Sequence, residues 1–160
     1  MRNYLLKLFI YITFFISLIL EILFIKCHNF MFHISWTLLI IICWIFIIPA
    51  EINIITSFIF GFIIDLFTDS LLGVRSLLFS IVILFILNKH KFIINLNIIN
   101  KTILIFTTFS VINIIYYYLN GYFLQIKCLN FILQNLINSV LYCVIYFCMK
   151  KIKYKYINYF

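Results

Sequence analysis

The sequence predicts an all-α membrane protein that forms a single integral-membrane domain over residues 1–160. Hydrophobic residues make up 67% of the chain and charged residues 10%, whereas a soluble domain carries about 25% charged residues. The mean hydropathy is +1.23. Because one bilayer span takes about 20 apolar residues, the chain has room for about six transmembrane helices in one bundle. A soluble enzyme is excluded, and no separate soluble domain fits.

Six apolar segments are the predicted transmembrane helices. They cover residues 5–25, 34–48, 52–67, 74–87, 102–119 and 130–149. Several are shorter than the about 20 residues that a span needs. Their ends must therefore include neighbouring residues, or the bilayer must thin locally.

The first three helices each carry one informative feature. The first crosses Glu21 and has no small-residue cleavage site after it, so it is expected to remain in the membrane rather than act as a cleaved signal. The second contains Trp36 and stops at Pro49, because proline breaks a helix. The third contains Gly61 and Asp65.

The second half of the chain contains a mixed segment and a polar stripe. The fourth helix follows Gly73, and residues 88–101 then mix Lys and Asn with Phe and Ile. This segment is either a short helix in the cytoplasmic interface or an ordinary loop. The sixth helix has a polar residue at every fourth position, which predicts a stripe facing other helices. The stripe is Asn130, Gln134, Asn138, Tyr142 and Tyr146. An AT-rich coding bias toward Asn and Tyr is the competing explanation.

The charge pattern predicts the orientation. The chain has 12 Lys and Arg against 4 Asp and Glu, a net charge of +8. In a soluble protein this excess would suggest nucleic acid, but here the basic residues lie between apolar runs and at the ends, so no nucleic-acid partner is expected. In the six-span arrangement, most basic residues collect on one side: Arg2, Lys7, Lys89, Lys91, Lys101, Lys150, Lys151, Lys153 and Lys155. That side is expected to be cytoplasmic, with both termini inside.

The residues that usually carry chemistry are few and scattered. The 5 cysteines form no C-x-x-C motif and have no zinc-like spacing with the 3 histidines. Cys27 and Cys128 fall on the same, non-cytoplasmic side, and whether they pair is left open. No nucleophile–base set can be assembled. The prediction is a protein with no catalytic, metal or cofactor site.

The acids within the membrane are more informative, because a charge at the bilayer centre is costly and is usually turned inward and paired. Asp65 lies within the third span, with Asp69 one turn later and Arg75 beyond Gly73. The first interpretation is that Asp65 or Asp69 pairs with Arg75 and fixes the turn between spans three and four. A contact with a partner helix and an ion or proton path are the alternatives. Glu21, one turn from Lys26, is expected to snorkel to the interface.

A small residue marks the same face as Asp65. Gly61 lies four residues before Asp65, so it gives that helix face a groove for close approach of another helix. We expect this groove to serve helix packing, within the bundle or with a partner.

The arrangement Gly61-x3-Asp65-x7-Gly73-x-Arg75, after a run that begins at Trp36 and ends at Pro49, resembles the central signature of the rod shape-determining protein MreD family. Asn138, followed by Ser139 in the last span, looks similar to that family too. The resemblance implies that these positions are structural or partner-interface residues: Trp36, Pro49, Gly61, Asp65, Gly73, Arg75 and Asn138.

The resemblance further implies a non-enzymatic subunit of the cell-elongation complex in the bacterial inner membrane, supporting cell shape and lateral peptidoglycan synthesis. The implied partner is the bitopic membrane protein MreC, and through it the actin-like MreB filament and the pair of RodA and a penicillin-binding protein. The implied six-helix bundle is similar to the substrate-binding subunits of energy-coupling-factor transporters. Two alternatives remain open: a small transporter subunit of that kind, or a membrane subunit of a respiratory complex.

Overall fold

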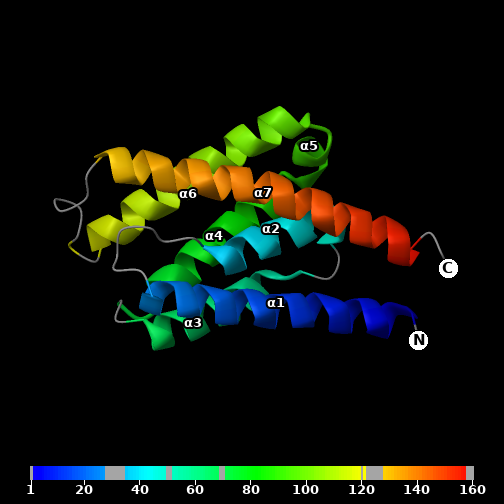
Figure 1. The fold of residues 1–160 in the computed structure, drawn as a ribbon, viewed down its shortest axis with the longest axis horizontal. Helices are drawn as coiled ribbons and strands as arrows, with labels where there is room; N and C mark the ends of the chain where they lie inside the picture. The colour runs from blue at the N-terminus through cyan, green and yellow to red at the C-terminus, as the bar shows by residue number, and fades with distance from the viewer. Residues whose placement is uncertain are drawn as a thin grey trace.

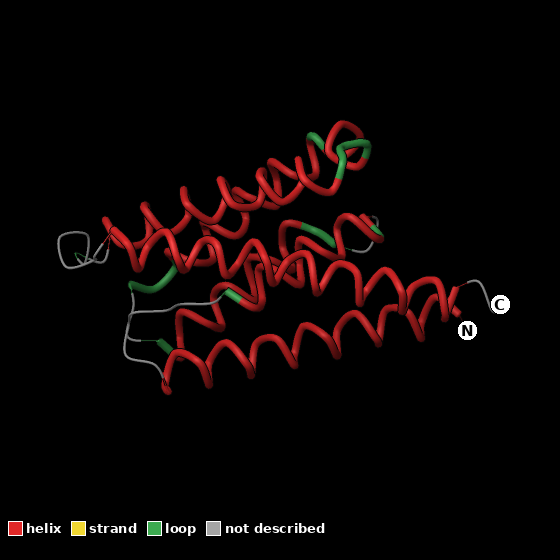
Figure 2. Tube along the Cα trace, turned by 45° about the horizontal axis from the view of Figure 1, so that its top comes forward, coloured by secondary structure: helices red, strands yellow, loops and turns green. Residues whose placement is uncertain are grey.

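The computed structural model is all-helical in the parts of the chain that it describes, residues 2–27, 35–49, 52–68, 71–119, 121 and 128–157. Seven helices lie within these residues (Figures 1 and 2). Their bounds are α1 Arg2–Cys27, α2 Trp36–Ile47, α3 Ile54–Phe67, α4 Val74–Asn88, α5 His90–Ile94, α6 Ile98–Leu119 and α7 Cys128–Ile157. A helix lies over each of the six predicted segments.

The helix lengths fall into two groups. By length and composition, α1, α6 and α7 are long and apolar enough to cross a membrane. The helices α2, α3 and α4 have 12, 14 and 15 residues. At 1.5 Å per residue these measure about 18–22 Å, less than the roughly 30 Å of the hydrocarbon core. The six-span topology therefore remains a prediction that requires extended helix ends or a thinner bilayer around α2, α3 and α4.

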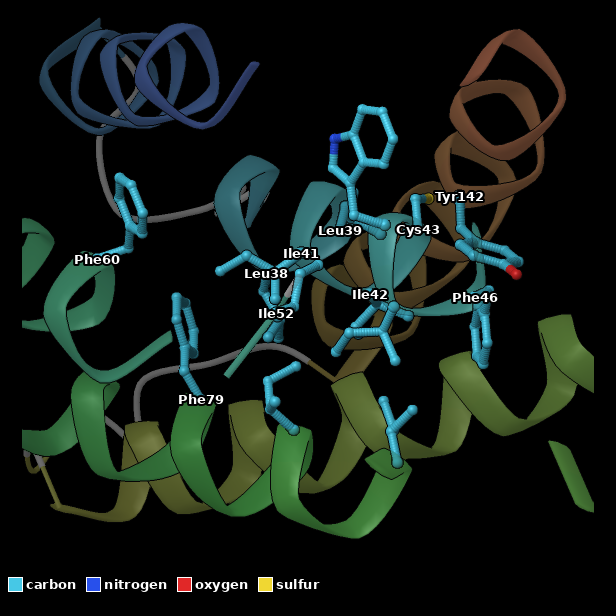
Figure 3. Packing of buried hydrophobic residues seen from close by; sticks show 14 of the residues in the cluster. Leu38, Leu39, Ile41, Ile42, Cys43, Phe46, Ile52, Phe60, Phe79 and Tyr142 are labelled. Atoms are coloured by element: carbon cyan, nitrogen blue, oxygen red, sulfur yellow. The ribbon is translucent and has the colours of Figure 1, made fainter. Parts of the chain in front are cut away.

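The helix α2 is the centre of the bundle. It is apolar nearly all round, and every residue from Thr37 to Ile47 except the half-buried Ile40 is buried, as expected of a core helix. It packs against α1, α3, α4 and α7. Figure 3 shows Phe60 of α3 and Phe79 of α4 on one side of α2, and Tyr142 of α7 beside Cys43 on another. The helix ends before Pro49 because the preceding residue, Ile48, leaves the helical region with φ −142° and ψ 81°.

The outer surfaces of the surrounding helices are apolar. Large side chains on α1, α3 and α7 are about half exposed, including Phe15, Ile59 and Phe147. Lipid tails can cover such surfaces, whereas backbone polar groups in lipid must be satisfied internally. Helices are the structures that satisfy them within one segment, so Ile-rich runs that would be weak helix formers in water form helices here.

The two ends of the bundle differ in composition. The helix α1 begins and α7 ends at the same end, where α5 also lies (Figure 1). We call this the basic end, because Lys91, Lys101 and Lys150 belong to its helices and Lys89 lies between α4 and α5. The opposite end is the polar end, and it holds the buried acids Glu21 and Asp65. The segment 88–101 contains the helix α5, so of the two alternatives left open for it the short helix is the one present, and its place in the cytoplasmic interface stays a prediction.

Candidate functional site

The candidate site is the buried polar cluster at the polar end of the bundle. It starts where α3 crosses α4 at Gly61. A Cβ atom added to Gly61 would lie 2.6 Å from Ser76 Cα and 2.9 Å from Ser76 N. Real Cβ atoms essentially never approach backbone so closely. Glycine at position 61 therefore allows the backbones of α3 and α4 to touch.

This crossing decides between the two expectations for the Gly61 face. The groove beside Gly61 was expected to serve helix packing, either within the bundle or with a partner. In the structure α4 of the same chain fills it, and Gly61 and Asp65 are both buried. The Gly61 face is thus used inside the bundle. It is not a surface that a partner can reach while α3 and α4 stay packed.

One turn after Gly61, the Asp65 carboxylate caps the start of α4. Asp65 Oδ2 accepts hydrogen bonds from the backbone N–H groups of Gly73 at 3.0 Å, Arg75 at 3.1 Å and Ser76 at 3.4 Å. These N–H groups have no partner within the helix, and the helix dipole favours a negative charge there. Gly73 has φ +91°, a left-handed conformation that glycine adopts without strain. The turn between α3 and α4 therefore needs both Asp65 and Gly73.

The structure brings Asp65 and Arg75 together, as the first interpretation of the sequence proposed. Arg75 Nε lies 3.9 Å from Asp65 Oδ1, and both side chains are nearly inaccessible. Arg75 Nη2 also donates a hydrogen bond of 2.7 Å to the hydroxyl of Tyr116 in α6. The guanidinium carbon lies 4.8 Å from the centroid of the Tyr116 ring. Arg75 therefore joins the α3–α4 pair to α6. The neighbouring Asp69 lies outside the described residues.

The position of Glu21 contradicts the sequence prediction. It does not snorkel to the interface, because its side chain is 0% exposed. Its Oε2 accepts a hydrogen bond of 2.9 Å from the backbone N–H of Thr37, in the first turn of α2. The N-cap residue, Ser35, makes no capping hydrogen bond with its own side chain. The carboxylate of α1 thus caps α2 just as Asp65 of α3 caps α4, and the charge of Arg75 acts on Glu21 as well.

The α6–α7 pair is joined by hydrogen bonds between side chains. Asn113 Nδ2 donates to Asn135 Oδ1 at 2.7 Å, and the Tyr117 hydroxyl donates to Gln134 Oε1 at 2.9 Å. All four residues are buried. A cavity of about 10 Å³ lies between α4 and α6, lined by Arg75, Asn113 and Tyr117 among others, which is close to the least space that holds one water molecule. This part of the cluster ties helices together and has no room for a small-molecule substrate.

The predicted stripe of α7 does face the bundle. Gln134, Asn138 and Tyr142 are buried, and Asn130 and Tyr146 are half-buried. The prediction that this stripe faces other helices is confirmed. Asn138 is 0% exposed, and neither of its amide atoms has a hydrogen-bond partner among the described residues.

The other residues singled out in the sequence lie at helix ends or pack against neighbouring helices. Trp36 opens α2, and its ring centroid lies 5.7 Å from that of Phe24 in α1. Pro49 is half-buried just beyond α2. Cys128 is a free, exposed cysteine at the start of α7, and the side chain of Cys27 lies outside the described residues. Within the described ranges no group of three His, Cys, Asp or Glu could hold a metal ion.

Several residues of the cluster were not predicted from the sequence. Tyr116, Tyr117 and Asn135 each bond across a helix pair. Tyr116 and Tyr117 stand in a run of three tyrosines, so no sequence signal marked which hydroxyl faces inward. Asn135 stands beside Gln134, one position off the predicted stripe. A wider stripe that includes the position next to each polar residue would have found it.

The Arg75–Tyr116 hydrogen bond supports a direct test. Replacing Tyr116 with phenylalanine removes the hydroxyl and leaves a buried guanidinium with one acceptor fewer. A hydrogen bond to a charged group contributes about 1.5–3 kcal/mol, so we expect a clear fall in the thermal midpoint of the purified protein in detergent. Tyr118→Phe is the matched control, because Tyr118 is 72% exposed. Equal midpoints for the two variants would contradict the assigned bond.

Taken together, the bundle and its internally bonded polar cluster define a helical membrane protein whose buried polar groups serve to hold helices. A family model described as rod shape-determining protein MreD matches residues 1–156. The chain therefore belongs to the MreD family, which makes it a rod-shape-determining membrane protein of a structural rather than enzymatic family. No solved structure matches it, so the likeness to substrate-binding subunits of energy-coupling-factor transporters stays a prediction.

Proposed function

We propose that this chain is a non-enzymatic subunit of the cell-elongation complex in the bacterial inner membrane, and that it acts by binding an MreC-like bitopic protein. Membership of the MreD family over residues 1–156 is the observation that carries the proposal. Through this partner the chain would be linked to an MreB-like filament and to the RodA and penicillin-binding protein pair that makes the lateral wall.

The polar cluster supports a binding role that depends on a rigid fold. Its acids, Arg75 and amides bond to other helices of the same chain. We propose that Trp36, Pro49, Gly61, Asp65, Gly73, Arg75 and Asn138 act as the frame that holds the helices in place, and that the partner contacts outward-facing residues. Apolar outer faces such as those of α1 and α3 suit another membrane helix, since packing drives helix association in lipid.

The proposal is tested by depleting the protein in its own rod-shaped host. Cells are expected to round up on depletion and to recover their rod shape when the wild-type chain is restored. Unchanged cell shape after complete depletion would contradict the role. Solute uptake by the purified protein alone in proteoliposomes would favour the transporter alternative instead.

The proposed orientation places the basic end in the cytoplasm and Cys128 on the outer side. Cys128 is exposed, whereas Cys43 is fully buried in α2. In a variant whose other cysteines are serine, we expect a membrane-impermeant maleimide to label Cys128 in intact spheroplasts. A variant that keeps only Cys43 is the control and should stay unlabelled. Labelling of Cys128 only after the membrane is broken would reverse the topology.

A further inference from the structure

The structure points to a binding site for an anionic phospholipid headgroup at the basic end of the bundle, and we propose this site as a feature beyond the role in cell elongation. It centres on Lys101, near the start of α6. Lys101 is only 6% exposed, yet its side chain has no carboxylate partner among the described residues. Its Nζ donates a hydrogen bond of 2.9 Å to the backbone carbonyl of Ile94 and lies 5.9 Å from the centroid of the Phe46 ring.

A second lysine reinforces this charge. Lys150 of α7 lies close enough for its charge to act on Lys101. Nearby ammonium groups repel each other, and an anion that binds at this place lowers the repulsion. Lys101 bonds to the carbonyl of Ile94 in α5 and lies near the Phe46 ring of α2, so its charge lies where α2, α5 and α6 meet.

The surroundings extend the positive charge. Lys89 directly precedes α5, Lys91 is its second residue, and Lys151 follows Lys150 in α7. These three lysines, Lys89, Lys91 and Lys151, are exposed. The acids in the described part of the chain, Glu21 and Asp65, are at the polar end. This composition favours a ligand with negative charge.

Apolar side chains next to the lysines indicate that the ligand is a lipid. The helix α5 is anchored by Ile93, which is 1% exposed, while Phe92 beside it is 68% exposed. Ile99, in the first turn of α6, is 71% exposed. A phosphodiester headgroup can meet the ammonium groups while its acyl chains lie along these apolar side chains. A soluble anion or an acidic peptide would leave Phe92 and Ile99 in water, so the lipid is the better fit. In the proposed orientation this is the cytoplasmic leaflet, whose anionic lipids attract basic residues.

The test uses the full-length protein purified in detergent and native mass spectrometry to measure bound lipid. Phosphatidylglycerol is compared with phosphatidylcholine of the same acyl chains, and inorganic phosphate is added as a competitor. Each lysine near an anionic surface contributes enough for about a fivefold change in affinity, so Lys101→Gln with Lys150→Gln should weaken phosphatidylglycerol binding by about 25-fold. Lys7→Gln, a charge-matched change on α1, should leave it unchanged.

A second variant keeps the test decisive if the buried Lys101 cannot be replaced without unfolding. Lys150→Gln with Lys151→Gln retains Lys101 and should also lower the affinity for phosphatidylglycerol, whereas the affinity for phosphatidylcholine should not change. Equal binding of the two lipids by the wild-type protein would overturn the site. Wild-type affinity for phosphatidylglycerol in the variants would overturn it as well. Displacement of the lipid by millimolar phosphate would also overturn it, because the lysines would then bind a soluble anion.

Discussion

Replacing Gly61 with leucine will stop the protein from accumulating as a folded bundle in the membrane. A Cβ atom at this position would lie 2.6 Å from Ser76 Cα, and leucine adds three further carbon atoms. Overpacking of a core costs about 1–3 kcal/mol even where side chains can adjust, and here the obstacle is backbone. The helices α3 and α4 must separate, and the hydrogen bonds from α4 to Asp65 are then lost. The measurement is the amount of monodisperse protein extracted from membranes, compared at equal expression.

The matched control lies on the same helix, one position further on. Phe62 is 40% exposed, so Phe62→Leu changes the outer face of α3 without touching α4. Its yield should equal that of the wild-type chain. A Gly61→Leu protein with wild-type yield and wild-type thermal midpoint would show that α3 and α4 do not cross at this glycine.

Replacing Asp65 with asparagine should have the second-largest effect. The amide keeps the shape and can still accept hydrogen bonds from the start of α4, but it removes the charge that faces Arg75. Breaking a buried ion pair by removing one partner costs about 3–5 kcal/mol, because the other charge stays buried without compensation. We expect a large fall in thermal midpoint in detergent and loss of protein from the membrane.

Two further variants separate charge from shape. Glu21→Gln should be milder than Asp65→Asn, because Asp65 accepts three backbone hydrogen bonds and lies beside Arg75. Both acids are buried, so depth in the bundle does not set this order. Adding Arg75→Gln to Asp65→Asn removes the uncompensated charge and should restore part of the stability. No recovery in the double variant would mean that the pair is not coupled.

Local signals in the sequence were sufficient to predict the helices and the α3–α4 turn. Long apolar runs, Pro49 and Gly73 mark where helices begin and end, and Asp65 and Arg75 are close enough along the chain to suggest a pair. The role of Glu21 was missed because its nearest opposite charge in sequence is Lys26, whereas its hydrogen-bond partner Thr37 is reached only after the chain has turned back. Such a contact depends on how α1 and α2 pack, which periodicity does not specify.

The direction of the Gly61 face was unpredictable for a related reason. A small residue shows that a helix can approach closely, but it does not show which helix does so. The structure assigns this place to α4, through Ser76. Tyr116 presents the same difficulty, since three consecutive tyrosines point in three directions and only packing selects the one that meets Arg75.

The central claim is that the folded bundle serves to bind a bitopic membrane partner, and co-purification from native membranes tests it most directly. The tagged chain is extracted from its own host after mild crosslinking, together with the Tyr118→Phe and Asp65→Asn variants at matched levels. The proposal predicts that an MreC-like protein is recovered with the wild-type chain and with Tyr118→Phe, and that its recovery falls with Asp65→Asn. Recovery of the wild-type chain in folded form without any MreC-like protein would contradict the claim.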